Sequence, residues 1–464
     1  MSLRIGQKIE LSIQSLISNG YGLARHDGLA VFVADALPGQ QVEATVTATK
    51  ARFAEARLET ILAEAPDTRP TLCSHSDQCG GCAWQSMQYS QQIVWKQRFV
   101  SDALRRIGRV AEPPVLPILP SPSEWGYRNK MTFAFAGQGE NLSLGLRRRA
   151  SHGLVDVTGC LLQTGRTMQV VETVRREARR SGLAAWNREK GGWWRFLVIR
   201  EPMAGGCLVE LITFPHPDAA RYAQNVAKAV FANCPEMSGF VLSERKAPED
   251  IAHGTRIRLS LYPGLDRNPR AAELDEDLGG LRLRLGAGAF FQVNTPAAIR
   301  LYDEAARLAA MEPVRRLWDL YCGVGSIGLY LARNLEPLPD LYGIEQSIRA
   351  VMLARNNAAS LQLQATYAQG DVGHLLNRRA KVQGEIPDLV VVDPPRAGLE
   401  PRVTAALCRL QPERILYVSC NPATLARDTA RLAPYRLEAV QPVDFFPQTP
   451  HVESMSLFVR NGKA

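Results

Sequence analysis

The chain has 464 residues, of which 46% are hydrophobic and 22% charged, so it is neither mostly disordered nor collagen-like, and its length predicts two or three domains. Its net charge of +9, from 55 basic and 46 acidic residues, is compatible with a polyanionic partner. Charges or prolines interrupt every apolar run before membrane-spanning length, and the N-terminus lacks a signal-peptide core, so we expect a cytoplasmic protein that crosses no membrane.

Residues 1–62 predict short strands joined by tight turns. Apolar and polar residues alternate from Ile9 to Ile13, and Asp27-Gly28 is a hairpin signal. Several short strands in so few residues predict a small β-barrel, because closure removes exposed strand edges. Barrels of this kind often hold oligonucleotides, and a purely structural barrel fits the pattern nearly as well.

Residues 63–280 predict a central α+β domain. Prolines break the chain at 65–70 and again at 113–122. Between the second break and residue 270, strand-like runs such as 208–214 are mixed with helical spacing, as at 167–180. The domain also holds two arginine clusters, at 147–149 and 175–180, which are solvated faces or nucleic-acid contacts.

From residue 313 onward, short apolar strands alternate regularly with helical stretches. This alternation is typical of a parallel sheet covered by helices on both faces. We therefore predict an α/β fold class with a doubly wound, Rossmann-like domain over 281–464. The predicted strands are 316–320, 341–344, 388–392 and 414–419, and the predicted helices are 327–334, 347–360, 403–410 and 424–432.

A glycine-rich loop at 319–328 predicts a cofactor site. It follows a strand and opens a helix, and its glycines let the backbone approach a ligand closely. Glu345 ends the next strand, about twenty residues on, where a carboxylate can accept hydrogen bonds from ribose hydroxyls. The combination predicts an adenosine-containing cofactor, either NAD or S-adenosylmethionine.

Two later strand ends carry residues that hydride transfer does not need. One strand leads into Asp393-Pro-Pro-Arg and another into Ser419-Cys420-Asn-Pro. In open α/β sheets, ligands bind outside the carboxyl ends of the strands, so Asp393 and Cys420 should face the same crevice as the glycine loop. A cysteine placed there is a candidate nucleophile rather than a packed core residue.

A thiol beside a methyl donor suits one reaction in particular. Carbon 5 of uracil becomes nucleophilic when a thiolate adds to carbon 6, and a base must then remove the carbon 5 proton so that the thiolate leaves. Cys420 supplies the thiol. Glu453 is our choice of base, because a carboxylate returns to its basic form without a perturbed pKa, and His451 is the alternative.

Five segments together resemble the ordered motifs of the RNA (uracil-5-)-methyltransferases, and the family's N-terminal TRAM barrel matches residues 1–62. The resemblance implies that Cys420 is the nucleophile and Glu453 the base. It implies S-adenosylmethionine contacts from Gln292, Tyr321, Glu345 and Asp393, with Asp371 a further one; many members have Asn where Ser326 stands, which leaves that contact open. The segments are 290–294, 319–325, 393–396, 419–422 and 451–454.

Three cysteines are spaced C-x5-C-x2-C, at Cys73, Cys79 and Cys82, and Cys160 completes a tetrad. Four thiolates suit zinc or a [4Fe–4S] cluster, and zinc more often uses two C-x2-C pairs, of which there is only one here. The family's iron–sulfur subgroup has the same three-plus-one arrangement, which implies a [4Fe–4S] cluster. We expect it to be structural.

The expected substrate is a uridine splayed out of folded RNA. Iron–sulfur members of the family mostly modify large-subunit ribosomal RNA, so the resemblance implies 23S rRNA, with tRNA the alternative, and we expect a monomer. The barrel, the arginine clusters and Trp193-Trp194 are candidate RNA-binding surfaces, in that order, although such tryptophans are more often core residues than stacking surfaces. Rival hypotheses are cytosine-5 methylation of RNA, a non-catalytic RNA-binding assembly factor, and an iron–sulfur redox enzyme.

Overall fold

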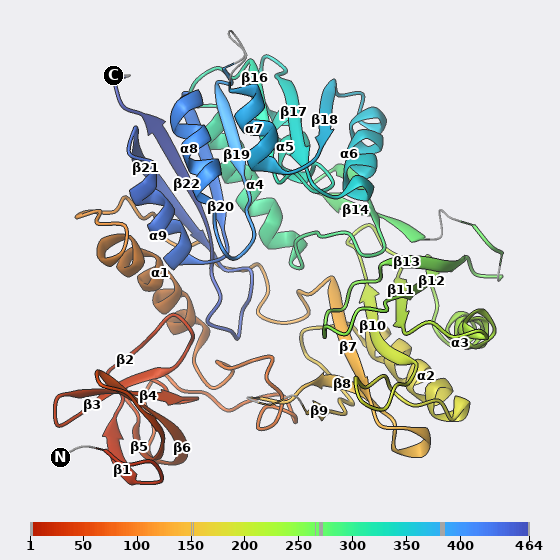
Figure 1. Ribbon diagram of the computed structural model, residues 1–464. Helices are drawn as coiled ribbons and strands as arrows, with labels where there is room; N and C mark the ends of the chain where they lie inside the picture. Colours follow the sequence, from red (N-terminus) through yellow and green to blue (C-terminus); the bar gives the residue numbers. More distant parts are fainter. Residues whose placement is uncertain are drawn as a thin grey trace.

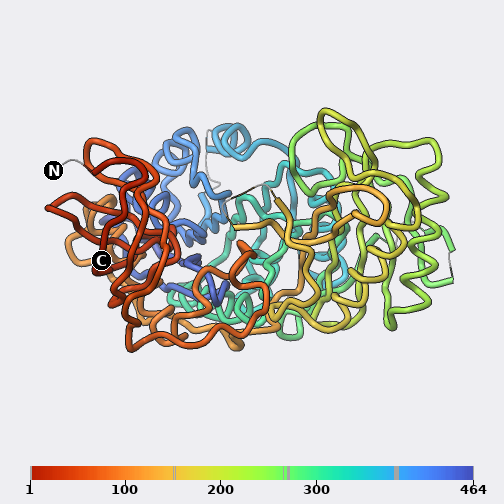
Figure 2. Tube along the Cα trace, turned by 90° about the horizontal axis from the view of Figure 1, so that it is seen from below, coloured from red at the N-terminus to blue at the C-terminus, as the bar shows by residue number. Residues whose placement is uncertain are grey.

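The computed structural model describes residues 3–462 apart from 150, 152, 265, 269–271 and 381–385. Two views show an N-terminal β-sheet and a central mixed sheet at opposite ends of the molecule, with the C-terminal sheet and its helices against both (Figures 1 and 2). Among the described residues, no helix combines the length and the apolar character that crossing a membrane requires.

The N-terminal strands form one curved sheet in the order β1-β5-β6-β4-β3-β2. Asp27 and Gly28 both have positive φ between β3 and β4, which confirms the predicted hairpin. Alternate residues such as Val31 and Val42 are fully buried inside the curve. Among the described residues, the end strands β1 and β2 do not pair with each other, so the sheet does not close into a complete barrel. Its strands are β1 (Lys8–Ser12), β2 (Ser15–Leu16), β3 (Gly22–His26), β4 (Leu29–Ala34), β5 (Gln41–Thr49) and β6 (Phe53–Ala63).

The central sheet has the order β13-β12-β11-β10-β7-β8-β9 and is covered by two helices. Trp193 and Trp194 lie in its core, 2% and 0% exposed, and their rings pack against the sheet and its helices. This confirms the expectation that they are core residues and removes them as candidates for stacking on RNA. Its elements are β7 (Lys130–Ala136), β8 (Ser143–Arg147), β9 (Leu154–Val155), α2 (Gly165–Ser181), β10 (Trp194–Arg200), β11 (Leu208–Thr213), α3 (Ala219–Asn233), β12 (Gly239–Glu244) and β13 (Arg256–Leu261), with a 3-10 turn at Gly139–Asn141.

The second arginine cluster is also not a simple basic surface. Arg175 is 4% exposed and donates to the carbonyls of Leu144 and Val157. Arg179 donates to the carbonyl of Leu142 and lies close to Asp156. These side chains tie helix α2 to the sheet beneath it.

The C-terminal sheet has the order β18-β17-β16-β19-β20-β22-β21, parallel except for β22, which is antiparallel to both of its neighbours. Helices cover both faces, which confirms the doubly wound α/β prediction (Figure 1). Its elements are α4 (Thr295–Ala309), β16 (Arg316–Leu320), α5 (Ser326–Asn334), β17 (Asp340–Glu345), α6 (Ile348–Ser360), β18 (Ala365–Gln369), α7 (Val372–Arg379), β19 (Leu389–Val392), α8 (Pro401–Leu410), β20 (Arg414–Ser419), α9 (Pro422–Arg431), β21 (Tyr435–Val443) and β22 (Glu453–Arg460).

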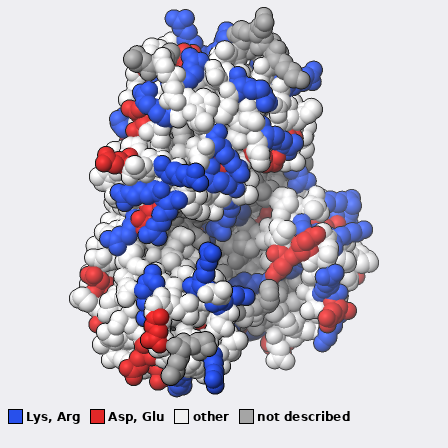
Figure 3. Space-filling model, turned by 60° about the vertical axis from the view of Figure 1, so that its left-hand side comes forward, with Lys and Arg blue, Asp and Glu red and all other residues white. Residues whose placement is uncertain are grey.

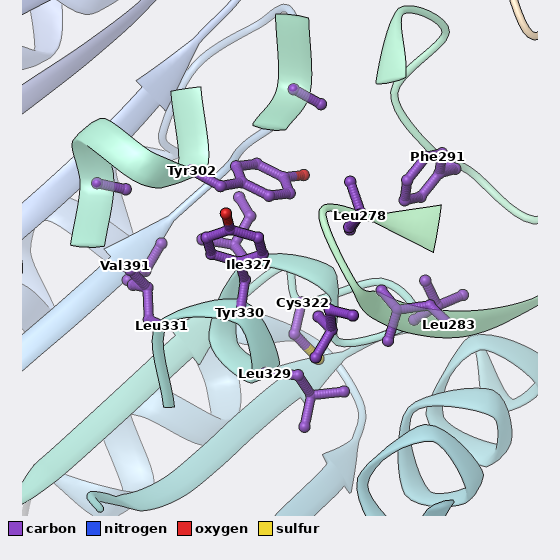
Figure 4. Packing of buried hydrophobic residues seen from close by; sticks show 14 of the residues in the cluster. Leu278, Leu283, Phe291, Tyr302, Cys322, Ile327, Leu329, Tyr330, Leu331 and Val391 are labelled. Atoms are coloured by element: carbon purple, nitrogen blue, oxygen red, sulfur yellow. The ribbon is translucent and has the colours of Figure 1, made fainter. Parts of the chain in front are cut away.

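Helix α1 (Tyr89–Arg106) and the hairpin of β14 (Glu273–Leu278) and β15 (Leu281–Gly286), which begin before residue 281, both pack with this C-terminal domain. Helix α1 lies against α9 and β21, and its Val100 and Leu104 are fully buried there. The hairpin sends Leu278 and Leu283 toward helix α5 (Figure 4). The three-domain division at 62/63 and 280/281 stays a prediction. In space, helix α1 and strand β14 of the predicted middle domain pack with the C-terminal sheet and its helices.

Candidate active site

Strand pairing brings Cys420 and Glu453 to the same edge of the C-terminal sheet. Ser419, the last residue of β20, pairs with Ser454 in β22, so Cys420 and Glu453 each lie one residue beyond that pair. Asp393 directly follows β19, the other neighbour of β20. The predicted crevice therefore collects all three side chains at the carboxyl ends of β19 and β20.

Cys420 lies between strand and helix, with its thiol partly buried. The Asn421 side chain accepts from the amide of Ala423 and caps helix α9, and Pro422 occupies the helix's first turn, so the chain turns sharply after Cys420. Burial raises the pKa of the thiol to about 11, with further contributions from the negative charges of Glu453 and Asp393. Arg396 opposes this rise. The thiol is protonated at neutral pH in the free protein.

Glu453 is the first residue of β22 and is 5% exposed. Burial, and then the charge of Asp393, raise its pKa well above 4.5, which makes the carboxylate a stronger base. His451 lies on the exposed rim of the cleft. Desolvation and then the positive charges of Arg396 and Lys96 lower its pKa to about 4, so it is neutral and a weak base at pH 7. This contrast favours Glu453 over His451.

The cofactor half of the cleft is built at the ends of β16 and β17. Tyr321 follows β16 with φ of +64°, and its amide donates to the carbonyl of Ile344. Glu345 ends β17, and its carboxylate accepts from the amides of Gly323, at 3.2 Å, and Ser347, at 2.7 Å. Glu345 is thereby held across the glycine loop with lone pairs left for ribose hydroxyls.

The remaining predicted contacts come from three separate loops. Gln292 is 7% exposed, and its backbone carbonyl accepts a hydrogen bond from the side-chain amide of Asn129. Asp371 caps helix α7 by accepting from the amide of His374, and it also lies 2.8 Å from Arg402. Asp393 is half-buried, and burial raises its pKa to about 7.

One cleft of about 670 Å³ joins both halves. It is lined by Cys420, Glu453 and the predicted cofactor contacts Gln292, Tyr321, Glu345, Asp371 and Asp393. Ser326 is not among them. It lines a smaller neighbouring cavity with Asp319, where the Tyr302 hydroxyl is 3.5 Å from the Ser326 hydroxyl.

Sequence reasoning did not single out several residues that line the cleft, among them Arg128, Phe290, Arg396 and Phe446. Phe290 and Arg396 stand within recognised segments, which was the available signal. Arg128 and Phe446 come from stretches that carry no motif signal by themselves. Phe290 is 71% exposed and reaches the cleft from the loop before helix α4.

The four predicted cluster cysteines line one adjacent cavity of about 640 Å³. Burial, and then the charges of Cys160 and Cys79, raise the pKa of Cys82 to about 12, so these thiols lie close enough to interact. Among the described residues, no three His, Cys, Asp or Glu side chains meet as they would around one metal ion.

Lys and Arg side chains gather in a band on the face of the molecule shown in Figure 3, beside a hollow. Helix α1 lies on this side of the molecule and exposes Arg98, Arg105 and Arg106. A band of this sign suits a polyanion, because phosphates bind guanidinium and ammonium groups.

Comparison with known proteins gives matches along the whole chain. Residues 279–461 match the tRNA (uracil-5-)-methyltransferase family and residues 3–58 match the TRAM domain. A protein of Nitratidesulfovibrio vulgaris named as an RNA methyltransferase is 44% identical over 458 residues, covering 97% of this chain and 96% of its own. A Bacillus cereus protein of the same description is 32% identical over 99% of this chain and 98% of its own.

A solved structure extends these matches to the fold. The tRNA (uracil-54, C5)-methyltransferase of Pyrococcus abyssi, in complex with S-adenosyl-L-homocysteine, is 25% identical with a TM-score of 0.75, covering 97% of this chain and 100% of that one. The site, the fold and the relatives agree. The chain therefore belongs to the RNA methyltransferases that join a TRAM domain to a tRNA (uracil-5-)-methyltransferase domain.

Proposed function

We propose that the protein methylates carbon 5 of a uridine in RNA through a covalent bond between Cys420 and carbon 6 of the base. The observation that carries the proposal is the pairing of Ser419 with Ser454, which sets the thiol and the buried carboxylate of Glu453 at one sheet edge. The carboxylates suited to a nucleoside cofactor line the same cleft.

Each step uses a residue of this chain. The Cys420 thiol loses its proton to solvent, and the thiolate adds to carbon 6, which turns the ring into an enolate with a nucleophilic carbon 5. S-adenosylmethionine supplies the electrophilic methyl group that carbon 5 attacks. Glu453 then takes the proton from carbon 5, the carbon–sulfur bond breaks, and the thiolate leaves. Arg396 favours the ionised form of both Cys420 and Glu453.

The test is covalent trapping on RNA that carries 5-fluorouridine, in the presence of S-adenosylmethionine. Carbon 5 then holds a fluorine that no base can remove, so wild-type protein should remain bound to the RNA through Cys420. Cys420→Ala should form no adduct, and Glu453→Gln should form one. An adduct through another side chain, or methyl transfer by Cys420→Ala, would overturn the proposal.

We propose that Cys73, Cys79, Cys82 and Cys160 hold a [4Fe–4S] cluster. The support is their common cavity and the three-plus-one spacing of the cysteines. Such a cluster would tie the segment around Cys79 to the loop around Cys160. Iron and acid-labile sulfide analysis of anaerobically purified protein tests this: about four of each per chain are expected, and one zinc per chain with no sulfide would contradict it.

We propose 23S rRNA as the substrate, methylated by a cytoplasmic monomer. The cysteine set supports rRNA, whereas the printed names of the matched family and of the Pyrococcus abyssi enzyme favour tRNA as the alternative. Mass-spectrometric mapping of 5-methyluridine in both RNAs from a strain lacking the gene decides between them. Loss of a ribosomal site supports the proposal, and loss only from tRNA overturns it. Light scattering during gel filtration tests the monomer.

A further inference from the structure

The loop 444–452, here called the base loop, joins β21 to β22 and leads directly into Glu453. Val443, the last residue before the loop, pairs with Glu453, the first residue after it. Both ends of the loop therefore lie side by side, and Asp444 directly follows the residue that pairs with Glu453. The loop also carries Phe446 and His451, which line the cleft.

A buried cation from helix α1 anchors the start of this loop. The Lys96 ammonium donates to Asp444 Oδ1 at 2.6 Å and to the carbonyl of Phe446 at 2.9 Å. Asp444 Oδ1 also accepts from the amide of Phe446 at 3.0 Å. The side chains of Lys96 and Asp444 are both fully buried. The ion pair thus closes a small ring that fixes the backbone of residues 444–446.

The same face of α1 anchors the loop again further along. Gln92 lies four residues before Lys96, one helical turn away, and is fully buried. Its side chain accepts from the Gln448 amide at 2.8 Å and donates to the Gln448 side chain at 3.0 Å. Helix α1 therefore holds the base loop at two points.

The first anchor connects to the cleft through Phe446. The ring of Phe446 meets the ring of His451 edge-on, with 6.0 Å between centroids. Lys96 therefore fixes the backbone of a residue whose side chain forms part of the cleft wall. A buried ion pair adds little net stability compared with apolar residues of similar volume, because desolvation opposes the attraction. Its placement here fits a role in fixing geometry.

We propose that Lys96 is a positioning residue, which through Asp444 and Phe446 holds the base loop so that Glu453 reaches the proton on carbon 5. The inference rests on the proposed function. It concerns only the last chemical step, because Cys420 is carried by β20 and α9 and not by the base loop.

The test separates the attack by Cys420 from the release of product. In the double variant Lys96→Met with Asp444→Asn, volume is nearly preserved and no buried charge is left unpaired. The hydrogen bonds of the ammonium are lost, as is its contact with the Trp84 ring, whose centroid is 6.0 Å away. On 5-fluorouridine RNA the double variant should form the adduct at the wild-type rate. On ordinary uridine RNA, a methylated covalent complex should accumulate, with release slowed about 10²-fold, as expected for a base displaced by about 1 Å.

Two further variants complete the test. Asp444→Asn alone leaves the buried Lys96 ammonium without its carboxylate partner, so it should lower thermal stability, and it should slow release as the double variant does. Arg414→Met removes another buried cation, at the start of β20 and therefore at the end of that strand away from the cleft. The Arg414 side chain donates to the carbonyls of Ala309 and Glu312. This control variant should lower thermal stability without accumulating a covalent complex.

The outcomes distinguish the two hypotheses. If wild-type protein forms no adduct on 5-fluorouridine RNA, the proposed function fails. If wild-type protein forms it and the double variant slows both steps equally, Lys96 has a merely structural role and the inference is overturned. Wild-type release by the double variant overturns it as well.

Discussion

The catalytic cleft and the cysteine cavity share one wall but differ in charge. Arg128, Phe290, Phe291 and Val293 line both. In the cleft, Cys420 has acidic neighbours such as Asp393 and Glu453. Around the four cysteines, the described lining is basic, with Arg128, Lys130 and Arg147–Arg149 and no carboxylate.

The difference in charge matches the different chemistry that we propose for the two thiol sites. Burial and the carboxylates beside Cys420 raise the pKa of its thiol, and we propose one of these carboxylates, Glu453, as the base. Arg128 opposes the rise in the pKa of Cys82 and Cys160, and in the proposed cluster such cations would offset the charge of bound thiolates. The two sites also differ in support. Strands β19, β20 and β22 position Cys420 and its acidic neighbours, whereas the four cysteines lie in loops beside strands β7 and β8.

Replacing one cysteine of each site with alanine should give the largest effects on activity and iron content, and it tests directly whether the two sites differ. Cys420→Ala should reduce methyl transfer by about 10⁴-fold or more while leaving iron content and melting temperature unchanged, because the nucleophile is lost and nothing else. Cys82→Ala should instead remove iron and lower the melting temperature. Methyl transfer, iron analysis and thermal unfolding of both variants check this, and identical phenotypes would break the distinction.

Glu345 sharpens the comparison within the cleft. Glu345→Ala should weaken S-adenosylmethionine binding by about 10- to 100-fold, since charge-assisted hydrogen bonds contribute about 1.5–3 kcal/mol. The iron content should not change. Calorimetric titration of the cofactor measures the effect, and Ser326→Ala, in the neighbouring cavity, is the matched control with an expected change below about threefold. An equal loss in both variants would contradict the assignment of Glu345.

The acids near the cleft should make stability depend on pH. Asp319 is 1% exposed, and burial raises its pKa from 3.8 to about 7. Between these values the folded protein holds a proton that the unfolded chain has lost, so stability falls as pH rises, by at most about 4 kcal/mol.

Asp319→Asn should remove this contribution. It keeps an acceptor for the Gly328 amide, which donates to Asp319 at 2.9 Å. The variant should gain stability relative to wild type between pH 4 and pH 7. Urea unfolding at several pH values measures the difference, and a constant difference across this range would refute the assignment of the pKa.

The shared wall gives the smallest expected effect. The charges of Arg396, Lys96 and Arg128, in that order, follow desolvation in lowering the pKa of His451. Arg128→Gln should therefore raise the pKa of His451 by less than Arg396→Gln does, and both should move it toward 6.5. Nuclear magnetic resonance titration of the imidazole measures both shifts. A larger shift of the His451 pKa in Arg128→Gln than in Arg396→Gln would contradict this order of electrostatic contributions.

Local patterns were sufficient for the regular half of the chain. Strands β16 and β20 begin and end where the apolar runs predicted, and the predicted helices agree with α5, α6, α8 and α9 to within two residues at either end. Asp393 and Cys420 were placed in one crevice because parallel strands end at one edge. These features depend on periodicity and strand direction, which neighbouring residues determine.

Long-range packing decided the rest. Helix α1 gave no usable signal, although its Lys96 reaches Asp444, 348 positions away. The sequence left two interpretations of Trp193-Trp194 open, because apolar rings look alike in a core and on a binding surface, and only the structure places both in the core.

The sequence by itself determined the α/β rhythm, the chemical groups of the site and their order along the chain. Only the tertiary structure decided which distant segments hold them, because a buried polar side chain chooses its partner by what folding brings within hydrogen-bond reach and not by its neighbours in sequence.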